Sequence, residues 1–123
     1  MPRKNTLLKF QNITNGAMSG NITSPATNIQ FMDDIGVQLN FTGTPTGTFQ
    51  IQVSIDYAQD AEGNIQNAGN WIPINLPSSP VASGGSGFIY IDLNMLSAPW
   101  IRVVYIASSG VGVLNSFLTG KEV

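Results

Sequence analysis

The sequence predicts an all-β protein, a single antiparallel β-sandwich or barrel of about seven or eight short strands. Apolar and polar residues alternate in several segments, which is the period of a half-buried strand. Turn-forming residues separate these segments at intervals of roughly 8–15 residues. Only residues 93–97 leave room for a helical turn, and Pro99 would end it. The pattern leaves the strand order open between jelly-roll-like and immunoglobulin-like.

The clearest strand is predicted from Thr48 to Asp56, where apolar residues occupy every second position. Because successive side chains of a strand point to opposite faces, one set should face the core and the other should face outward. The residues predicted to face the core are Phe49, Ile51, Val53 and Ile55, and those predicted to face outward are Gln50, Gln52 and Ser54.

The segment before it shows the same alternation, with Val37, Leu39 and Phe41 at every second position. The link from Thr42 to Gly47 consists of threonine, glycine and proline, which favour turns. The two strands are therefore predicted to form an antiparallel hairpin.

The remaining strands are predicted from shorter apolar runs. A strand over Leu7–Ile13 is followed by a turn at Asn15-Gly16, and a strand over Ile29–Met32 precedes Asp33-Asp34. Further along the chain, the predicted strands contain Trp71, Ile72 and Ile74; Phe88–Leu93; Trp100–Ile106; and Val111–Leu118. The last two flank Ser108-Ser109-Gly110 and are predicted to form a C-terminal hairpin.

The composition describes a weakly charged domain. Hydrophobic residues make up 42% of the 123 residues, enough for one core, whereas charged residues make up only 10%. Amides and hydroxyls therefore form the polar surface, which suits a protein that contacts other proteins. We expect residues 1–5 to be a flexible N-terminal arm and residues 6–123 to form the single domain.

Charge and hydropathy argue against several classes of partner. The net charge of −2 argues against a nucleic-acid partner, because phosphate binding needs a basic patch. No run of 18 apolar residues predicts a membrane span, and the first residues lack the apolar run of a secretory leader. Three of the five basic residues, Arg3, Lys4 and Lys9, lie near the N-terminus and are candidate partner contacts.

The absence of histidine and cysteine argues against catalysis. It removes the commonest general base, the Ser-His and Cys-His nucleophiles and most zinc sites. Paired carboxylates remain possible, but acids in turns usually face solvent. Asp60, Glu62 and Asn64 are candidates for a Ca²⁺ loop, but their spacing differs from the helical Ca²⁺ loop and a solvated loop is favoured. We therefore expect a non-enzymatic protein without a metal, cofactor or small-molecule substrate.

The large aromatic residues are candidates for core or binding positions. Trp71 and Trp100 are predicted partner-binding residues together with the basic cluster, because tryptophan and tyrosine are frequent at interfaces. With Tyr90 and Tyr105 they could instead form a platform that stacks against sugars. Arg102, a single cation in an apolar strand, is predicted to pair with Asp92 or Asp56 or to face solvent.

Three segments of the chain resemble small structural proteins of tailed bacteriophages. They are NIQFMDDIGVQLNFTGTPTGTFQIQVSID at 28–56, NWIPINL at 70–76 and IDLNMLSAPWIRVVY at 91–105, followed by the glycine-containing C-terminal segment. The likeness covers most of residues 28–120, and none of its motifs is a catalytic signature. The loop over Asp60–Gly69 is longer than the resemblance leads us to expect, which leaves the role of that loop open.

The resemblance implies a virion component that is assembled in the host cytoplasm. Among virion positions, we expect a capsid decoration or cement protein, bound in many copies or as a homo-oligomer to the major capsid protein. A neck or tail component is the alternative within the virion. A carbohydrate-binding or host-receptor-binding β-sandwich is the alternative from another functional class.

Overall fold

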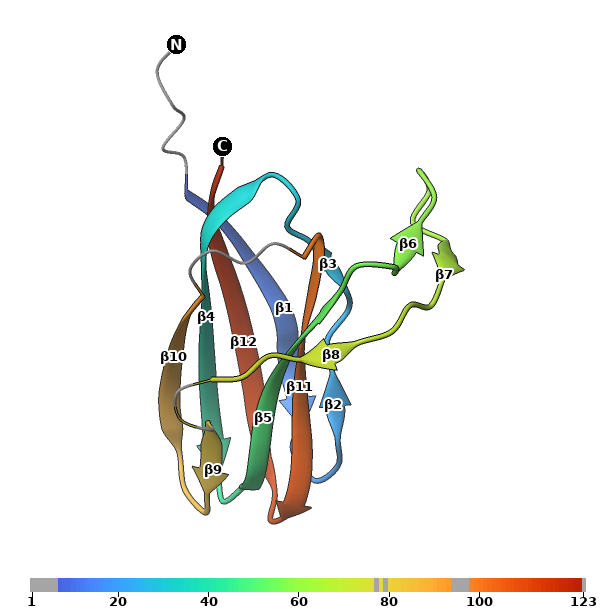
Figure 1. The fold of residues 1–123 in the computed structure, drawn as a ribbon. Coiled ribbons are helices and arrows are strands. Elements are labelled where there is room, and N and C mark those ends of the chain that lie inside the picture. Colours follow the sequence, from blue (N-terminus) through green and yellow to red (C-terminus); the bar gives the residue numbers. More distant parts are fainter. Residues whose placement is uncertain (1–6, 77, 79, 94–97, 123) are drawn as a thin grey trace.

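A computed structural model describes residues 7–76, 78, 80–93 and 98–122, and this part of the chain is all-β. The prediction of an antiparallel β-sandwich or barrel-like fold is confirmed (Figure 1). Among the described residues, no helix is long and apolar enough to cross a membrane. The strands are β1 (Leu7–Ala17), β2 (Ile22–Thr23), β3 (Thr27–Asn28), β4 (Met32–Gly43), β5 (Thr46–Ser54), β6 (Ala58–Gln59), β7 (Ile65–Asn67), β8 (Ile72–Pro73), β9 (Val81–Ser83), β10 (Gly87–Leu93), β11 (Trp100–Ser109) and β12 (Gly112–Glu122).

Two sheets make up the sandwich. The four-stranded sheet has the order β1-β12-β4-β10. The six-stranded sheet has the order β2-β11-β5-β8, with β3 also paired to β11 and β9 also paired to β5. All these pairings are antiparallel. The short strands β6 and β7 form a separate hairpin that projects from the side of the sandwich (Figure 1).

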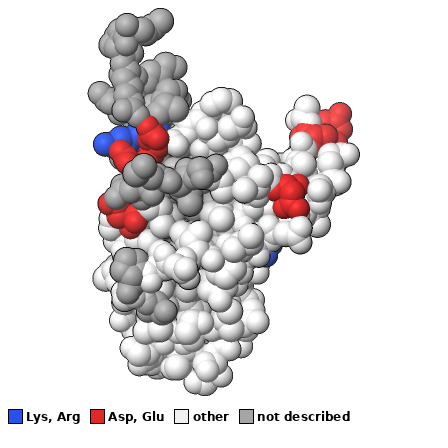
Figure 2. Space-filling view, in the orientation of Figure 1, with Lys and Arg blue, Asp and Glu red and all other residues white. Residues whose placement is uncertain are grey.

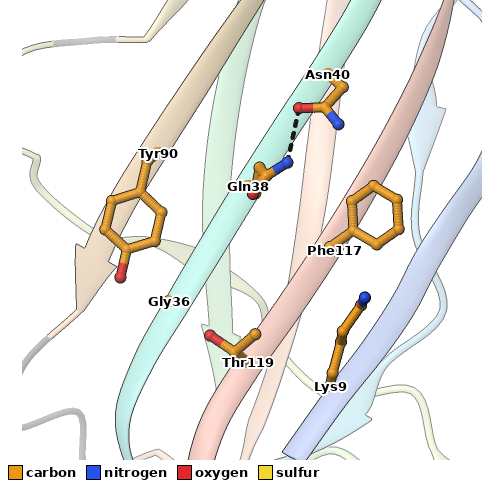
Figure 3. A pocket seen from close by; sticks show the side chains of 7 residues that line it. All are labelled: Lys9, Gly36, Gln38, Asn40, Tyr90, Phe117 and Thr119. Atoms are coloured by element: carbon orange, nitrogen blue, oxygen red, sulfur yellow. Dashed lines mark hydrogen bonds between the residues drawn. The ribbon is translucent and has the colours of Figure 1, made fainter.

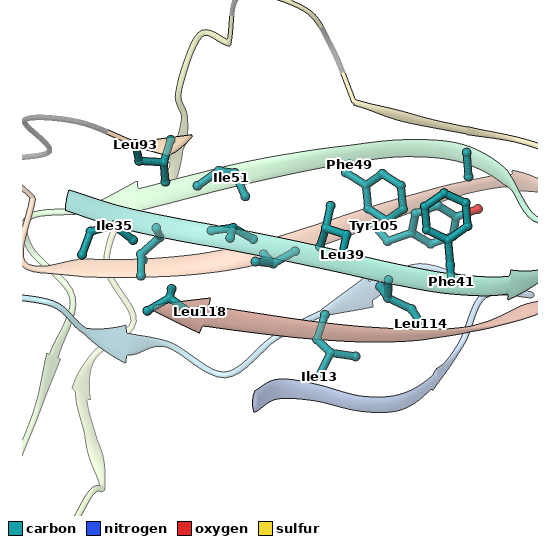
Figure 4. Packing of buried hydrophobic residues seen from close by; sticks show 14 of the residues in the cluster. Ile13, Ile35, Leu39, Phe41, Phe49, Ile51, Leu93, Tyr105, Leu114 and Leu118 are labelled. Carbon is teal, nitrogen blue, oxygen red and sulfur yellow. The ribbon is translucent and has the colours of Figure 1, made fainter. Parts of the chain in front are cut away.

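The core lies between the two sheets (Figure 4). The four-stranded sheet contributes buried side chains from β4 and β12, and the six-stranded sheet contributes them from β5 and β11. An aromatic series crosses the core near one end: the ring centroids of Phe41 and Phe49 are 5.5 Å apart and those of Phe49 and Tyr105 are 4.9 Å apart. The predicted inward positions Val37, Leu39 and Phe41 are all buried.

The predicted hairpin of the two clearest strands is wrong, because β4 and β5 lie in different sheets. The link between them crosses the edge of the core from one sheet to the other. Gly43 adopts a φ of 93°, Pro45 is buried, and the N–H of Thr44 donates to the carbonyl of Val111 at 2.8 Å. Alternation places one face of each strand in the core, but two facing strands satisfy that pattern as well as two paired strands do.

The predicted C-terminal hairpin is wrong for the same reason. Strand β11 pairs with β5, whereas β12 pairs with β1 and β4 in the other sheet. The second crossing packs directly against the first, since a Cβ on Gly110 would collide with the carbonyl oxygen of Thr44. Gly110 also has a φ of 82°, a conformation that favours glycine. The glycines that predict hairpin turns thus allow two crossings to lie against each other.

The predicted register of β5 holds for Phe49 and Ile51, which are buried, and for Val53, which packs against the core. It fails for Ile55, because the strand ends at Ser54 and the side chain of Ile55 is 80% exposed. Ser54, predicted to face outward, is buried. Its hydroxyl accepts from the N–H of Tyr57 and donates to Asp56, so the chain turns away from the sheet at this point.

Two shorter predictions also need correction. Asn15-Gly16 is a bulge within β1 and not a turn after it: the pairing with β12 shifts between Ile13 and Gly16, and Asn15 has a φ of 50°. The segment after residue 28 forms no strand until Met32, and Asp33-Asp34 lies inside β4. The predicted helical turn at 93–97 lies largely outside the described residues, and Leu93 ends β10.

Candidate functional site

A group of large polar and aromatic side chains lies on the outer face of the six-stranded sheet. We call Tyr57, Trp71, Trp100 and Arg102, with Gln52, the tryptophan–arginine cluster. Arg102 lies on β11 directly opposite Gln52 of β5, and its neighbours Ile101 and Val103 are buried in the core. Alternation therefore sends Arg102 outward.

The guanidinium of Arg102 is held by two contacts. Its Cζ atom lies 4.3 Å from the ring centroid of Trp71, which is a cation–π stack. Its Nε–H donates to Oε1 of Gln52 at 2.8 Å, and Gln52 in turn donates to Gln50 at 3.0 Å. Burial lowers the pKa of Arg102 below its usual value. The predicted pairing with Asp92 or Asp56 is therefore replaced by a stack and an amide contact.

Tyr57 links the two tryptophans. Its ring is tilted against that of Trp71, with the centroids 5.3 Å apart, and meets that of Trp100 edge-on, with the centroids 4.8 Å apart. Its hydroxyl accepts from Nε2 of Gln59 at 2.7 Å, and Nε1 of Trp71 donates to the carbonyl of Ala68 at 3.1 Å. The structure thus brings the predicted residues Trp71 and Trp100 into one cluster. The sequence pattern does not single out Tyr57, because no periodic strand surrounds it.

The excursion, residues 56–70, positions Tyr57 and Trp71. Asp56 closes its base: its carboxylate accepts from the backbone N–H and from the side-chain amide of Asn70, both at 2.8 Å. These bonds and one from Ser54 stabilise the charged form, so the pKa of Asp56 is lowered, with the Asn70 backbone bond as the largest cause. Asp56 therefore joins the two ends of the excursion through its hydrogen bonds with Asn70.

Asp60 organises the tip of the excursion. Its carboxylate accepts from the backbone N–H groups of Glu62 and Asn64 and from the side-chain amides of Asn64 and Gln66. The backbone bond from Asn64 is the largest cause of its lowered pKa. In the segment considered as a Ca²⁺ loop, the carboxylate of Asp60 thus closes a tight turn.

A hollow of about 330 Å³ lies beside this cluster. Arg102, Trp71 and Tyr57 line one part of it, and residues 24–26 with Gly63 and Ile65 of the excursion line the rest. One apolar side chain of the lining, Ile65, is 62% exposed. An aromatic hollow that contains one cation and one exposed apolar side chain can receive a polar side chain from a partner protein.

A second surface lies on the outer face of the four-stranded sheet. A shallow groove of about 270 Å³ runs over Gly36, with Tyr90 on one side and Phe117 on the other (Figure 3). Gln38 lies between the two rings and donates to Asn40 at 3.0 Å. Because Gly36 has no side chain, the Tyr90 hydroxyl can approach the backbone there.

The predicted basic cluster falls on this sheet or outside the described residues. The Nζ of Lys9 lies 5.9 Å from the ring centroid of Phe117, so Lys9 borders the groove. Arg3 and Lys4 lie outside the described residues. The suggested four-residue aromatic platform does not form as one surface, because Tyr105 is buried in the core and Tyr90 lies on the opposite sheet from Trp71 and Trp100.

The charges are unevenly distributed. In Figure 2, acidic side chains gather near the end of the sandwich where β1 begins and β12 ends, and on the projecting excursion, and most of the surface between them is uncharged. On the four-stranded sheet, Lys121 pairs with Asp34 at 3.6 Å, and both side chains are about half exposed. Such an exposed pair adds little stability.

Comparison with solved structures finds similar folds. The protein YomS derived from the SPBc2 prophage superposes with a TM-score of 0.55 at 8% identity, over 93% of both chains. A chain from the structure of infectious bursal disease virus, Gx strain, superposes with a TM-score of 0.53 at 11% identity, over 95% of this chain and 32% of the viral chain. The xylan-binding CBM22-1 domain of Paenibacillus barcinonensis Xyn10C reaches a TM-score of only 0.45 at 7% identity, so we draw nothing from it.

These similarities establish the fold. The sequence itself matches no protein-family model, and no curated protein is similar to it in sequence.

Proposed function

We propose that this chain is a non-enzymatic structural protein of a phage virion, a decoration protein bound in many copies to the head surface. The observation that carries the proposal is the full-length likeness to a prophage-derived protein, together with the likeness to a viral chain. A neck or tail position is the alternative within the virion.

The strand order supports the same class. We infer that it is the order of a jelly roll, in which two four-stranded sheets face each other and successive strands repeatedly cross between them. The six-stranded sheet matches this plan because β2 and β3 both pair with β11, and β8 and β9 both pair with β5. Here the chain passes from β4 to β5, from β9 to β10, from β10 to β11 and from β11 to β12 by changing sheet each time. Jelly rolls are common in viral capsid domains.

The tryptophan–arginine cluster supports an attachment role. Tryptophan, tyrosine and arginine are the residues that most often dominate binding energy at interfaces. Here they contact one another beside a hollow whose lining includes the exposed Ile65. A sequence without histidine or cysteine supports a non-enzymatic role. The carboxylates of Asp56 and Asp60 accept structural hydrogen bonds, which supports it further.

Mass spectrometry of purified particles tests the proposal. A copy number on the order of hundreds per particle is expected for a head protein, whereas about a dozen would indicate a ring in the neck or tail. Absence of the protein from particles would refute the proposal. In a binding assay with particles that lack the protein, Trp71→Ala should reduce occupancy, and Phe88→Ala, at an exposed aromatic on the opposite sheet, should not.

A second candidate, glycan binding, is favoured by the groove in Figure 3. The groove combines two aromatic rings with amide groups, and such surfaces can stack against and hydrogen-bond a sugar. A glycan array comparing the wild type with Phe117→Ala and Trp71→Ala discriminates the two functions. Loss of a specific glycan signal in Phe117→Ala would support the second candidate, and no signal with the wild type would exclude it.

A further inference from the structure

Arg102 is a partly buried cation without an acidic partner in the described part of the chain. A guanidinium carries five N–H donors, and here the described residues accept only from the Nε–H. A charge that is partly removed from water without a counter-ion is unfavourable. The terminal nitrogens of Arg102 are not among the buried unpartnered atoms of the described residues, so they remain accessible to an anion.

The guanidinium is also held in a defined orientation. The ring of Trp71 stacks against it at 4.3 Å, and Gln52, itself bonded to Gln50, holds its Nε–H. The planar fork of arginine matches the two oxygens of a carboxylate. Because the fork is held before a ligand arrives, little side-chain entropy would be lost on binding.

The surroundings of Arg102 favour one source of that carboxylate. The hollow has aromatic walls, and its lining includes Ile65, which is 62% exposed. An exposed apolar side chain beside aromatic walls suits contact with a protein partner. The excursion beside the hollow carries Asp56, Asp60 and Glu62, which would repel a polyanion such as an acidic polysaccharide. A single carboxylate on a protein side chain avoids most of this repulsion.

We propose that Arg102 binds the carboxylate of an aspartate or glutamate side chain presented by the protein partner of this chain. Trp71 and Tyr57 form the walls of the site, and the exposed Ile65 packs against the partner beside the ion pair. This assignment rests on the proposed attachment function, since it identifies the chemistry by which the tryptophan–arginine cluster recognises its partner.

The first experiment tests the site on the isolated protein. N-acetyl-glutamic acid α-amide is titrated while the Arg102 Nε–H and Trp71 Nε1–H signals are followed by NMR. We expect both signals to shift, with a dissociation constant on the order of 1–10 mM. N-acetyl-glutamine α-amide should cause no shift. Arg102→Gln should abolish the response of the Trp71 signal, and Arg102→Lys, which keeps the charge without the fork, should weaken binding at least five-fold. Lys121→Gln, at an exposed cation on the other sheet, should bind as the wild type does.

Other ligands decide the source of the anion. Glucuronic acid binding more tightly than the blocked glutamate would overturn the proposal in favour of an acidic glycan. Equal binding of inorganic phosphate would overturn it in favour of a general anion site. No response to the blocked glutamate would also overturn it, without affecting the proposed virion function.

The second experiment uses particles that lack the protein. Occupancy by Arg102→Gln should fall at least ten-fold relative to the wild type, whereas Lys121→Gln should bind normally. Unchanged occupancy with a folded Arg102→Gln variant would refute the role of the carboxylate while leaving the attachment function intact. Failure of the wild type to occur on particles would refute the attachment function, whatever the outcome of the titration.

Discussion

Replacing Ile51 and Ile55 by alanine separates the register seen in the structure from the one that alternation predicts. Alternation places both residues in the core, but Ile51 is fully buried in β5 opposite Val103, whereas Ile55 lies beyond the strand and is 80% exposed. Ile51→Ala removes buried methyl groups from between two sheets and leaves a cavity. The expected loss is about 2–5 kcal/mol of unfolding free energy.

The magnitude is large enough to measure by thermal unfolding. For a chain of this length, each kcal/mol corresponds to about 4 °C, so Ile51→Ala should lower Tm by roughly 8–20 °C. Ile55→Ala should change the unfolding free energy by no more than about 0.5 kcal/mol. Urea unfolding monitored by circular dichroism gives the free energies. An unchanged slope of the unfolding free energy against urea concentration would show that both variants unfold in the same transition as the wild type. Similar losses in both variants would refute the assignment of Ile55 to the surface.

Three further predictions concern the crossing, the excursion and the N-terminal segment. Gly110→Ala should destabilise the protein by about 1–3 kcal/mol or more in urea unfolding, because the φ of Gly110 is positive and the new Cβ would collide with the carbonyl oxygen of Thr44 in the neighbouring crossing. The control Gly20→Ala should leave the unfolding free energy within about 0.5 kcal/mol of the wild type. The pKa of Asp56 is lowered from 3.8, so its contribution to stability is present above that pH and is lost as the pH falls through the folded-state pKa. In an NMR pH titration, the chemical shift of the Asn70 amide should accordingly change with a midpoint below pH 3.8, and this transition should be absent in Asp56→Asn. A midpoint at or above pH 3.8 would contradict the hydrogen bonds from Asn70 to the Asp56 carboxylate. A variant that lacks residues 1–5 should fold normally but bind particles less well than the wild type does, with the larger loss at low salt, because salt screens the charge pairing of Arg3 and Lys4. Occupancy equal to that of the wild type at both low and high salt would show that this segment is not an attachment element.

Part of the candidate site could be predicted from residue types, and its assembly could not. Trp71 and Trp100 are predicted partner residues because large aromatics are frequent at interfaces. Their joining through Tyr57, and the stack of Arg102 on Trp71, depend on where the excursion returns to the sheet. That return is set by the hydrogen bonds of Asp56 to Asn70, which join residues 14 positions apart.

The sequence by itself determined the all-β class and the inward faces of the long strands, because alternation with a period of two places Val37, Leu39 and Ile51 on buried faces. The absence of histidine and cysteine likewise narrowed the chemistry open to the chain, because residue types alone decide which nucleophiles and general bases it can supply. Only the tertiary structure decided which strands share a sheet. A strand with one apolar face buries that face equally well beside its sequence neighbour or across the core from it. The assignment of each strand to a sheet depends on long-range pairing, in which β12 lies between β1 and β4, and on the packing of the two crossings at Gly43 and Gly110.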